Sequence, residues 1–400
     1  MIMISNDFKN EIREELQGNI IPFWKALRDD EHGGFYGHVA FDLSVQKTAD
    51  KGGIFISRIL WFFSECFLTL KSAELLDYAA HAYKFLCGMF DEQNGGIYWS
   101  ATFDGAPADT TKHVYVQAFA VYALSAYYKA SGDTAALDKA VELYNLIETT
   151  CRDEYSFGES YDKTFGETLV NEHLSENDVI AEKTMNTLLH AFEGFSGLHE
   201  ALNGCNSAVI IEVERSMRRI LGDFKSKIYN GKLRRQEVFF DKHMKSIIDL
   251  QSYGHDIESA WLIEWGAGLL GDAELSREIA AITSELAESV MERAYRNSYV
   301  WNERVRADED KTSVWWVQAE AILGFLNHYK KHPHKPEFKR AAEDIWEYIK
   351  AKIIDSRPGS EWFYKLDESG TPDGDEPFAG EWKCPYHNGR MCIRLLAVVL

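Results

Sequence analysis

Two apolar patterns alternate along the chain, and both have helical spacing. In the first, a single apolar stripe runs along residues 134–150, at Leu137, Ala140, Val141, Tyr144 and Ile147. Such a helix buries one face and exposes the other to water. In the second, residues 54–68 and 114–124 are apolar nearly all round, which is typical of a helix packed on both sides. The two patterns predict an outer and an inner layer of helices.

Glycine and aromatic residues form a turn-like segment that separates successive pairs of helices. The segment returns at intervals of roughly 60 to 75 residues, a period typical of repeat architectures. Its occurrences are residues 33–36, 95–99, 155–158, 231–240, 299–302 and 359–364. These six occurrences predict six structural units.

The patterns and the repeat together predict where each helix begins. Inner helices are expected near Gly53, His113, Ala181, Ser252, Thr312 and Tyr386. Outer helices are expected near Asp7, Ala73, Thr134, Asn206, Asp272 and Pro336. Six helices in each layer predict an all-α fold, an (α/α)6 barrel that the first and last helices close. No linker or shift in composition divides the chain, so residues 1–400 are expected to form a single domain.

Charge and composition narrow the possible partners. The net charge is −20 and the pI is near 5.1, so the surface repels nucleic-acid phosphates and anionic lipids. No secretory signal is visible, and no apolar run is long enough to span a bilayer. We therefore expect a cytoplasmic monomer or weak homo-oligomer whose partner is a neutral small molecule, with no nucleic acid and no membrane.

Cysteine usage and phosphate-binding motifs limit the chemistry further. The six cysteines are scattered and form no CxxC pair, which is typical of reduced thiols and not of a disulfide scaffold. The chain has no Walker-type phosphate loop and no strand-anchored GxGxxG. A nucleotide or dinucleotide cofactor is therefore not expected.

Polar residues that are unusual in apolar helices gather near the starts of the predicted inner helices. Matching ends of ring-forming helices converge on one mouth, and a charge or imidazole in an apolar helix needs a partner or a water-filled space. The candidates for one cleft are Arg58, Tyr115, Asn186, His190, His255, Glu258, Trp316, Glu320, Trp382 and His387.

Two pairs of candidates share a helical face. His255 and Glu258 are three residues apart, and a carboxylate beside an imidazole fixes its tautomer and raises its basicity, as a general base requires. A structural histidine satisfied by a neighbouring helix is the plain alternative, and a metal site is disfavoured because di-metal bundles use the order Glu then His. Asn186 and His190 are four apart and could hold a sugar hydroxyl and move a proton.

The remaining candidates could each have a role in catalysis or binding, or a purely structural role. Pro385 and Tyr386 mark a helix entry, so His387 lies in the first turn, where the helix dipole lowers its proton affinity. Arg58 is the one cation of its apolar helix and could stabilise an enolate oxygen or form a buried ion pair. Tryptophans can stack on sugars or simply fill the core, which applies to Trp316 and Trp382. Two further side chains are expected at the solvent side or in ion pairs, Lys183 and Lys311.

Four segments resemble the bacterial cellobiose 2-epimerases of the N-acylglucosamine 2-epimerase superfamily. They are residues 57–61, 253–258, 315–320 and 382–391, and the similarity runs over essentially the whole chain. The resemblance implies an (α/α)6 barrel that needs no cofactor or metal. It also implies that His255 and His387 are an acid/base pair on opposite faces of C2 of the sugar, with Glu258 supporting His255.

The resemblance implies further roles and an activity. Arg58 holds the oxygens of an enediolate, and His190 belongs to the catalytic group. Side chains that bind or shape the sugar site are Tyr115, Asn186, Trp316, Glu320 and Trp382. The expected reaction is epimerisation at C2 of the reducing-end aldose of a β-1,4-linked disaccharide, from cellobiose to 4-O-β-D-glucosyl-D-mannose and from lactose to epilactose.

Three other functions are alternatives to this interpretation. A monosaccharide isomerase or 2-epimerase of the mannose or N-acylglucosamine type fits the same barrel, because return of the proton to C1 yields a ketose. An (α/α)6 glycoside hydrolase requires two carboxylates flanking the glycosidic bond, where this chain has histidines. A carbohydrate-binding barrel without catalysis does not explain the convergence of three histidines.

Overall fold

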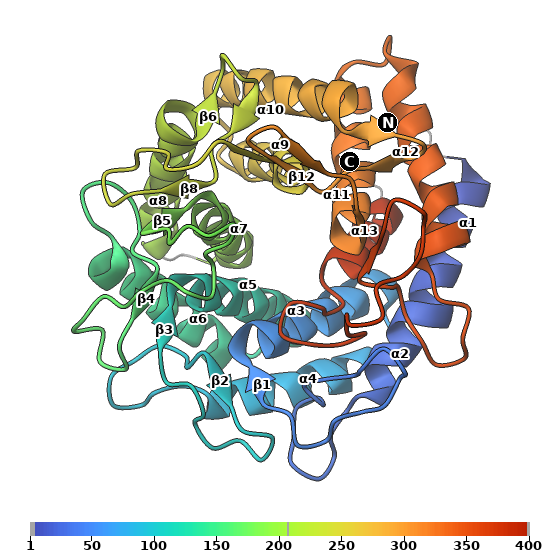
Figure 1. Ribbon diagram of the computed structural model, residues 1–400. Coiled ribbons are helices and arrows are strands. Elements are labelled where there is room, and N and C mark those ends of the chain that lie inside the picture. The colour runs from blue at the N-terminus through green and yellow to red at the C-terminus, as the bar shows by residue number, and fades with distance from the viewer. Residues whose placement is uncertain (1–4, 206–207, 398–400) are drawn as a thin grey trace.

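Helices form two concentric rings in the computed structural model, which describes residues 5–205 and 208–397 (Figure 1). The inner ring consists of α3 (Gly53–Leu70), α5 (Val114–Ser131), α7 (Met185–Leu202), α9 (Tyr253–Leu269), α11 (Trp315–Lys331) and α13 (His387–Leu396). The outer ring begins with α1 (Asn6–Glu15), η1 (Leu16–Ile20) and α2 (Ile21–Ala26). It continues with α4 (Ala73–Gly88), α6 (Thr134–Leu146), α8 (Val209–Asp223), α10 (Ala273–Arg293) and α12 (Pro336–Tyr348). The predicted (α/α)6 barrel is confirmed.

As α1 continues into η1, three further outer helices continue into one π-helical turn each. These turns are η2 (Ile147–Cys151), η3 (Phe224–Ile228) and η4 (Ile349–Ile353). Each inner helix contacts its two neighbours in the ring, and α13 contacts both α11 and α3. The ring is therefore closed by a helix from late in the chain. Its outer layer is closed in the same way, because Trp346 Nε1 and Trp362 Nε1 donate to Glu11 and Glu15, each at 2.7 Å.

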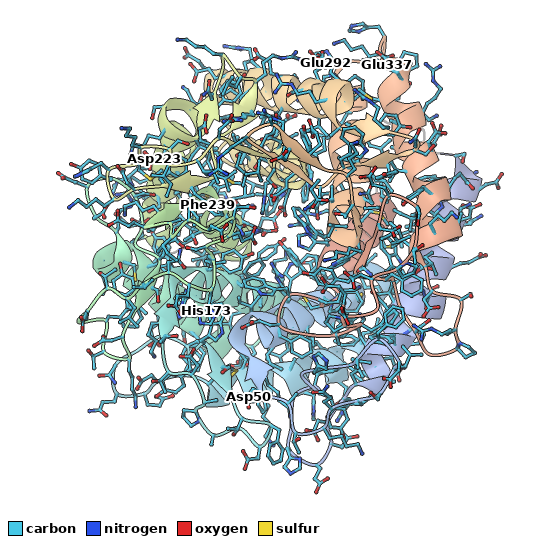
Figure 2. The ribbon with its side chains drawn as sticks, in the orientation of Figure 1. Asp50, His173, Asp223, Phe239, Glu292 and Glu337 are labelled. Atoms are coloured by element: carbon cyan, nitrogen blue, oxygen red, sulfur yellow. The ribbon has the colours of Figure 1, made fainter. Side chains whose placement is uncertain are left out.

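Burial follows the two predicted layers. The inner helix α5 is buried without interruption from Val114 to Tyr127, whereas the outer helix α8 buries one face around Val213, Met217 and Ile220. Figure 2 shows the charged side chains of Glu292 and Glu337 pointing outward from the outer ring, while Phe239 lies nearer the centre. The exposed faces of these outer helices thus carry charged side chains.

One inner helix has the composition of a membrane span. Among the described residues, α3 alone is long and apolar enough to cross a bilayer, and 72% of that stretch is buried inside the barrel. A helix enclosed on all sides is expected to be apolar all round. The composition of α3 is therefore explained by its place in the inner ring.

Most helices begin within three residues of the predicted positions. The inner helix expected near Ala181 starts at Met185, because Lys183–Thr184 form strand β5. The helix expected near Thr312 starts at Trp315, after strand β14 (Ser313–Val314). The expected start near Asn206 lies outside the described residues, and α8 begins at Val209. The apolar pattern did not reveal these strands, since they are too short to show a period of two.

Short antiparallel strand pairs line the end of the barrel at which the inner helices begin. Five such pairs connect the segment before an inner helix to the segment that follows a later turn. They are β1–β2 (Lys51–Gly52, Ser100–Ala101), β3–β4 (Lys112–His113, Ser160–Tyr161), β5–β8 (Lys183–Thr184, Phe239–Phe240), β9–β12 (Leu250–Ser252, Glu303–Val305) and β14–β15 (Ser313–Val314, Lys365–Leu366). The other strands are β6 (Tyr229–Asn230), β7 (Arg235–Gln236), β10 (Tyr295–Arg296), β11 (Tyr299–Val300) and β13 (Asp308–Asp310). These pairs hold the loops in place around the mouth of the barrel.

A buried lysine anchors the turn segment in three of the repeats. Lys183 Nζ lies 2.7 Å from Asp153 Oδ2 and 2.9 Å from the carbonyl oxygen of Phe157. The same arrangement joins Lys51 to Asp29 and Lys112 to Asp91. Lys183 is therefore ion-paired, as predicted, but buried. Lys311 also follows the prediction, because it is partly exposed and its Nζ lies 3.9 Å from Glu368.

Candidate active site

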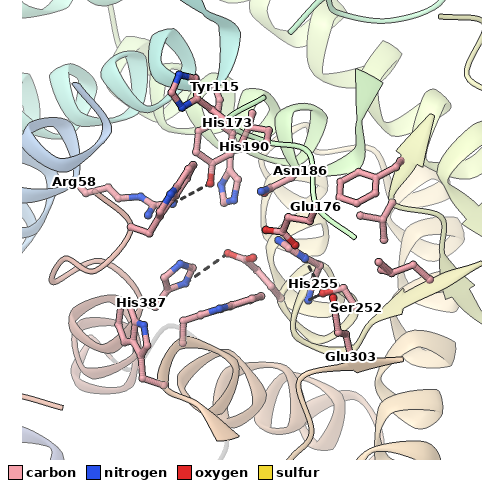
Figure 3. A pocket seen from close by; sticks show the side chains of 18 of the residues that line it. Arg58, Tyr115, His173, Glu176, Asn186, His190, Ser252, His255, Glu303 and His387 are labelled. Atoms are coloured by element: carbon pink, nitrogen blue, oxygen red, sulfur yellow. Dashed lines mark hydrogen bonds and ion pairs between the residues drawn. The ribbon is translucent and has the colours of Figure 1, made fainter. Parts of the chain in front are cut away.

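A cleft of about 190 Å³ opens at the end of the barrel where the inner helices begin. Predicted site residues line it from all six inner helices and the loop before α13, namely Arg58, Tyr115, Asn186, His190, His255, Glu258, Trp316, Trp382 and His387. Figure 3 shows His387 and His255 on opposite sides of the opening, with Arg58 and Tyr115 along a third side. The convergence expected from the helix starts is present.

His387 is the first residue of α13, as predicted, and is almost fully buried. Its Nδ1 lies 2.8 Å from Glu320 Oε1. Burial lowers the pKa of His387 well below its ordinary value, and the charges of Arg390 and Arg58 lower it further. The ring is therefore neutral at neutral pH, with Nε2 left as the basic nitrogen. The cause is mainly desolvation, where the sequence suggested the helix dipole.

The expectation that Glu320 binds substrate is corrected by its position. Glu320 is fully buried and does not line the cleft, because it lies behind His387 and between two other donors. Its Oε2 accepts a hydrogen bond from Trp261 Nε1 at 2.9 Å, and its Oε1 accepts one from Arg390 at 2.7 Å. A carboxylate held in this way fixes the imidazole of His387 with Nδ1 as the donor.

The predicted pair of His255 and Glu258 is also wrong. His255 Nδ1 lies 2.8 Å from the hydroxyl of Ser252, the N-cap of α9, while Glu258 Oε1 is bound by Arg390. Desolvation and, to a smaller extent, His190 lower the pKa of His255 to about 3. Helical spacing allowed a contact between His255 and Glu258, three residues later. In the structure the imidazole instead contacts Ser252, three residues earlier.

Trp316 packs against both imidazoles. The centroid of its ring lies 4.9 Å from that of His255 and 5.3 Å from that of His387. The indole has room only because residue 254 is glycine, since a Cβ atom there would lie 2.4 Å from the indole of Trp316. Gly254 thus belongs to the positioning of both histidines.

A third imidazole is held by a carboxylate that the sequence analysis missed. His190 Nδ1 lies 2.8 Å from Glu193 Oε2, and the hydroxyl of Tyr386 donates to the same oxygen. Burial would raise the pKa of Glu193, but the charge of Arg390 and the hydrogen bond with His190 lower it to about 2. Glu193 lies one helical turn after His190, so the spacing of the two residues carried the signal.

Arg58 is buried without a carboxylate partner among the described residues. Its guanidinium lies over the rings of Phe119 and Tyr386, at 4.2 and 4.7 Å. Nη2 donates to the hydroxyl of Tyr115 at 3.0 Å, and Nη1 lies 3.9 Å from Cys384 Sγ. Within the described part of the chain, Arg58 therefore does not form the buried ion pair that the sequence left open as an alternative. The positive charge lines the cleft and is available to an anionic ligand.

Two buried acceptors also lack a protein partner. Glu258 Oε2 and Asn186 Oδ1 are buried and have no hydrogen-bond partner within the described ranges. Both residues line the cleft. A buried polar atom is costly unless it is hydrogen-bonded, so these two oxygens suit the hydroxyl groups of a sugar.

Loops and strand β12 supply further lining residues that the sequence did not indicate. They include His173, Glu176, Glu303 and Tyr364. The ring of His173 stacks on Trp99 at 4.0 Å, and burial together with Glu176 raises the pKa of Glu303 to about 7. Loops and very short strands have no sequence periodicity that predicts which way a side chain points. The place of these residues in the cleft is therefore visible only in the structure.

One group of side chains has the spacing of a metal site. In the part of the chain that the structure describes, only Glu258, Glu320 and His387 place three potential ligand atoms within 4.8 Å of one another. However, Arg390 Nη2 donates to both carboxylates. The guanidinium already lies where a metal ion would bind the two carboxylates, and its positive charge would repel a divalent cation.

Known proteins are similar to this chain both in sequence and in the barrel fold. A model of the family described as N-acylglucosamine 2-epimerase (GlcNAc 2-epimerase) matches residues 34–188 and 215–389. The cellobiose 2-epimerase of Eubacterium cellulosolvens is 46% identical over 97% of this chain and 98% of that protein. The structure of cellobiose 2-epimerase from Bacillus thermoamylovorans B4167 has a TM-score of 0.93 at 41% identity, over 99% of this chain and 100% of that one. A D-mannose isomerase with a TM-score of 0.81 and 18% identity, over 99% and 98% of the two chains, shares the fold. This protein belongs to the N-acylglucosamine 2-epimerase family.

Proposed function

We propose that this protein is a cofactor-independent epimerase that inverts C2 of the reducing-end aldose of a β-1,4-linked disaccharide such as cellobiose or lactose. The observation that carries the proposal is the pair of imidazoles, His255 and His387, on two sides of one cleft. Inversion requires removal of a proton from one face of C2 and return of a proton to the other. The names of the relatives support a disaccharide as substrate.

The proton transfers follow from the state of the two rings. In the open-chain sugar, one neutral imidazole takes the C2 proton and becomes imidazolium, which leaves a cis-enediolate. The second imidazole takes up a proton from water at Nε2 and donates it to the opposite face of C2, and the first imidazolium then releases its extra proton to water, so both rings end neutral as they began. The negative charge of the enediolate favours the protonated form of a nearby imidazole, against the desolvation that lowers its pKa.

Other lining residues fit the same reaction. Arg58 stabilises the enediolate oxygen, because its charge is not neutralised by a carboxylate. His190, with Glu193 behind it, serves ring opening, and the free oxygens of Glu258 and Asn186 accept hydrogen bonds from sugar hydroxyls. Trp316 and Trp382 offer apolar faces to the sugar rings. Glycoside hydrolysis is less favoured, because the relatives that cover nearly the whole chain are named epimerases.

The proposal predicts that epimerisation in D2O labels C2. Cellobiose is incubated with the enzyme in D2O with EDTA present, and the recovered disaccharides are analysed by mass spectrometry and NMR. The epimer is expected to carry deuterium at C2 after one conversion, because the returning proton comes from an imidazole that exchanges with water.

The other outcomes separate the competing reactions. An unlabelled epimer would contradict proton transfer through solvent-exchanging histidines. Deuterium at C1 of a ketose would indicate an aldose–ketose isomerase, and release of monosaccharides would indicate a hydrolase. Conversion that stops in EDTA and returns with a divalent ion would contradict a metal-free mechanism.

Substitution of Gly254 tests whether Trp316 sets the separation of the histidines. In Gly254→Ala the new Cβ displaces the indole, so kcat is expected to fall by roughly 10- to 100-fold, the effect of misplacing a catalytic group by about 1 Å. Gly268→Ala is the control on the same helix, because a Cβ there meets nothing within 4 Å. Equal kcat values for the two variants would exclude the positioning role of Gly254.

A further inference from the structure

Arg390 connects four helices of the inner ring. It lies on α13, one turn after His387, and is fully buried. Nη1 donates to Glu193 Oε1 on α7 and to the hydroxyl of Tyr386. Nη2 donates to Glu258 Oε1 on α9 and, at 2.7 Å, to Glu320 Oε1 on α11. A single guanidinium thus satisfies one oxygen of each of three carboxylates.

Two of these carboxylates also hold an imidazole. Glu193 Oε2 accepts from His190 Nδ1 and Glu320 Oε1 accepts from His387 Nδ1, each at 2.8 Å. The resulting chain runs from His190 through Glu193, Arg390 and Glu320 to His387 without a gap. An ionised carboxylate can only accept hydrogen bonds, so both imidazoles present Nε2 as the basic nitrogen.

Arg390 is the only cation that contacts these three carboxylates within the described residues. The other guanidinium of the cleft, Arg58, binds Tyr115 and Cys384 and makes no ion pair there. Removing the charge from a buried ion network leaves carboxylates uncompensated, which is strongly unfavourable. The carboxylates would then favour a proton on the adjacent imidazole.

Several charged or titratable groups surround His387. They are Tyr386 at the N-cap of α13, Arg390 on α13, Arg58 on α3, His190 and Glu193 on α7, His255 and Glu258 on α9, and Glu320 on α11. Burial is the largest cause of the low pKa of His387, and Arg390 is the next. Arg390 therefore has both the contacts and the charge to set the state of this ring.

We propose that Arg390 is a positioning residue that couples His190 and His387, by holding the carboxylate that orients each imidazole and by keeping His387 unprotonated. The coupling of two catalytic groups rests on the proposed function, whereas the control of the His387 ring does not. The two parts are separable by experiment.

The test compares Arg390→Met with Arg394→Met. Arg394 lies one turn further along α13 and packs on the rings of Trp261 and Trp265, away from the cleft. Protein labelled with ¹⁵N-histidine is titrated by NMR without sugar, and His387 is assigned from the signal lost in His387→Asn. In the wild type and in Arg394→Met, His387 is expected to stay neutral down to the pH at which the fold is lost. In Arg390→Met it is expected to titrate at higher pH, because removal of a positive neighbour raises an imidazole pKa.

Kinetics supply the second readout. For Arg390→Met, kcat is expected to fall on the order of 100-fold, and the acid limb of kcat/KM should move to higher pH. Arg390→Lys keeps the charge but not the fork that holds three carboxylates. It should therefore lower kcat while its acid limb stays close to that of the wild type.

An unchanged His387 titration in a folded Arg390→Met variant would overturn the proposal. If that variant does not fold, an Arg390→Lys enzyme with wild-type kcat would overturn it in the same way. Should the wild type not epimerise disaccharides, the proposed function fails, and the NMR titration still decides whether Arg390 controls His387.

Discussion

Replacing His387 by Asn is expected to reduce epimerisation by roughly 10²- to 10⁴-fold, the usual contribution of a general acid or base. Asparagine retains a donor for Glu320 and removes the basic nitrogen, so the fold and sugar binding should persist. The same loss is expected for His255→Asn, because each ring serves one face of C2. Initial rates with cellobiose and binding of a non-epimerisable analogue are the measurements.

Isotope exchange makes this prediction more specific. With one imidazole left, a variant should still exchange the C2 hydrogen of one epimer with solvent deuterium, without inversion. His387→Asn and His255→Asn should therefore exchange opposite epimers. His328→Asn is the control, since His328 is equally buried but packs against Phe338 on the outer ring. A near-normal rate in His387→Asn, or exchange of the same epimer by both variants, would contradict the assignment of two faces.

Arg58→Met is expected to lower kcat by roughly 10²- to 10³-fold, as for loss of a group that stabilises an oxyanion. Its effect on stability should be the opposite of that on activity. Arg58 carries a buried charge with no carboxylate partner among the described residues, so a methionine that fills the same space removes a desolvation cost. The melting temperature should stay unchanged or rise while turnover is lost.

A second buried arginine provides the comparison for Arg58. Arg235 is equally inaccessible but forms ion pairs with Glu237 and Asp249. Arg235→Met should therefore lower the melting temperature, because it leaves the largely buried carboxylate of Glu237 without a counter-charge. If Arg58→Met destabilised the protein as much as Arg235→Met does, the role of Arg58 would be structural.

The sequence predicted the fold well because the barrel depends on patterns that extend over many residues. The apolar stripe of residues 134–150 and the fully apolar segment 54–68 distinguish the two layers. The start of α7 was misplaced because β5 is fixed by pairing with β8, from a different repeat. Such a contact between distant segments leaves no trace in local periodicity.

Most residues of the candidate site could be predicted from the sequence, but the hydrogen bonds and ion pairs between them were harder to predict. Arg58 and His387 stood out as polar groups in apolar helices, and both line the cleft. The predicted partner of His255 was wrong because helical spacing brings several residues close to its side chain and does not determine which of them makes the contact. Arg390 lies within the segment that resembles known epimerases, yet its role emerges only when three other helices bring their carboxylates to it.

Closure of the ring also determines when the protein becomes active during folding. The hydrogen bond between Trp346 and Glu11 spans 335 residues, and α13 packs against both α3 and α11. Contacts across such sequence distances cost loop entropy and form late. A chain that has formed its local helix pairs but has not docked α13 lacks both His387 and Arg390 in the cleft. Recovery of turnover on refolding therefore reports completion of the barrel, whereas helical circular dichroism reports the earlier local steps.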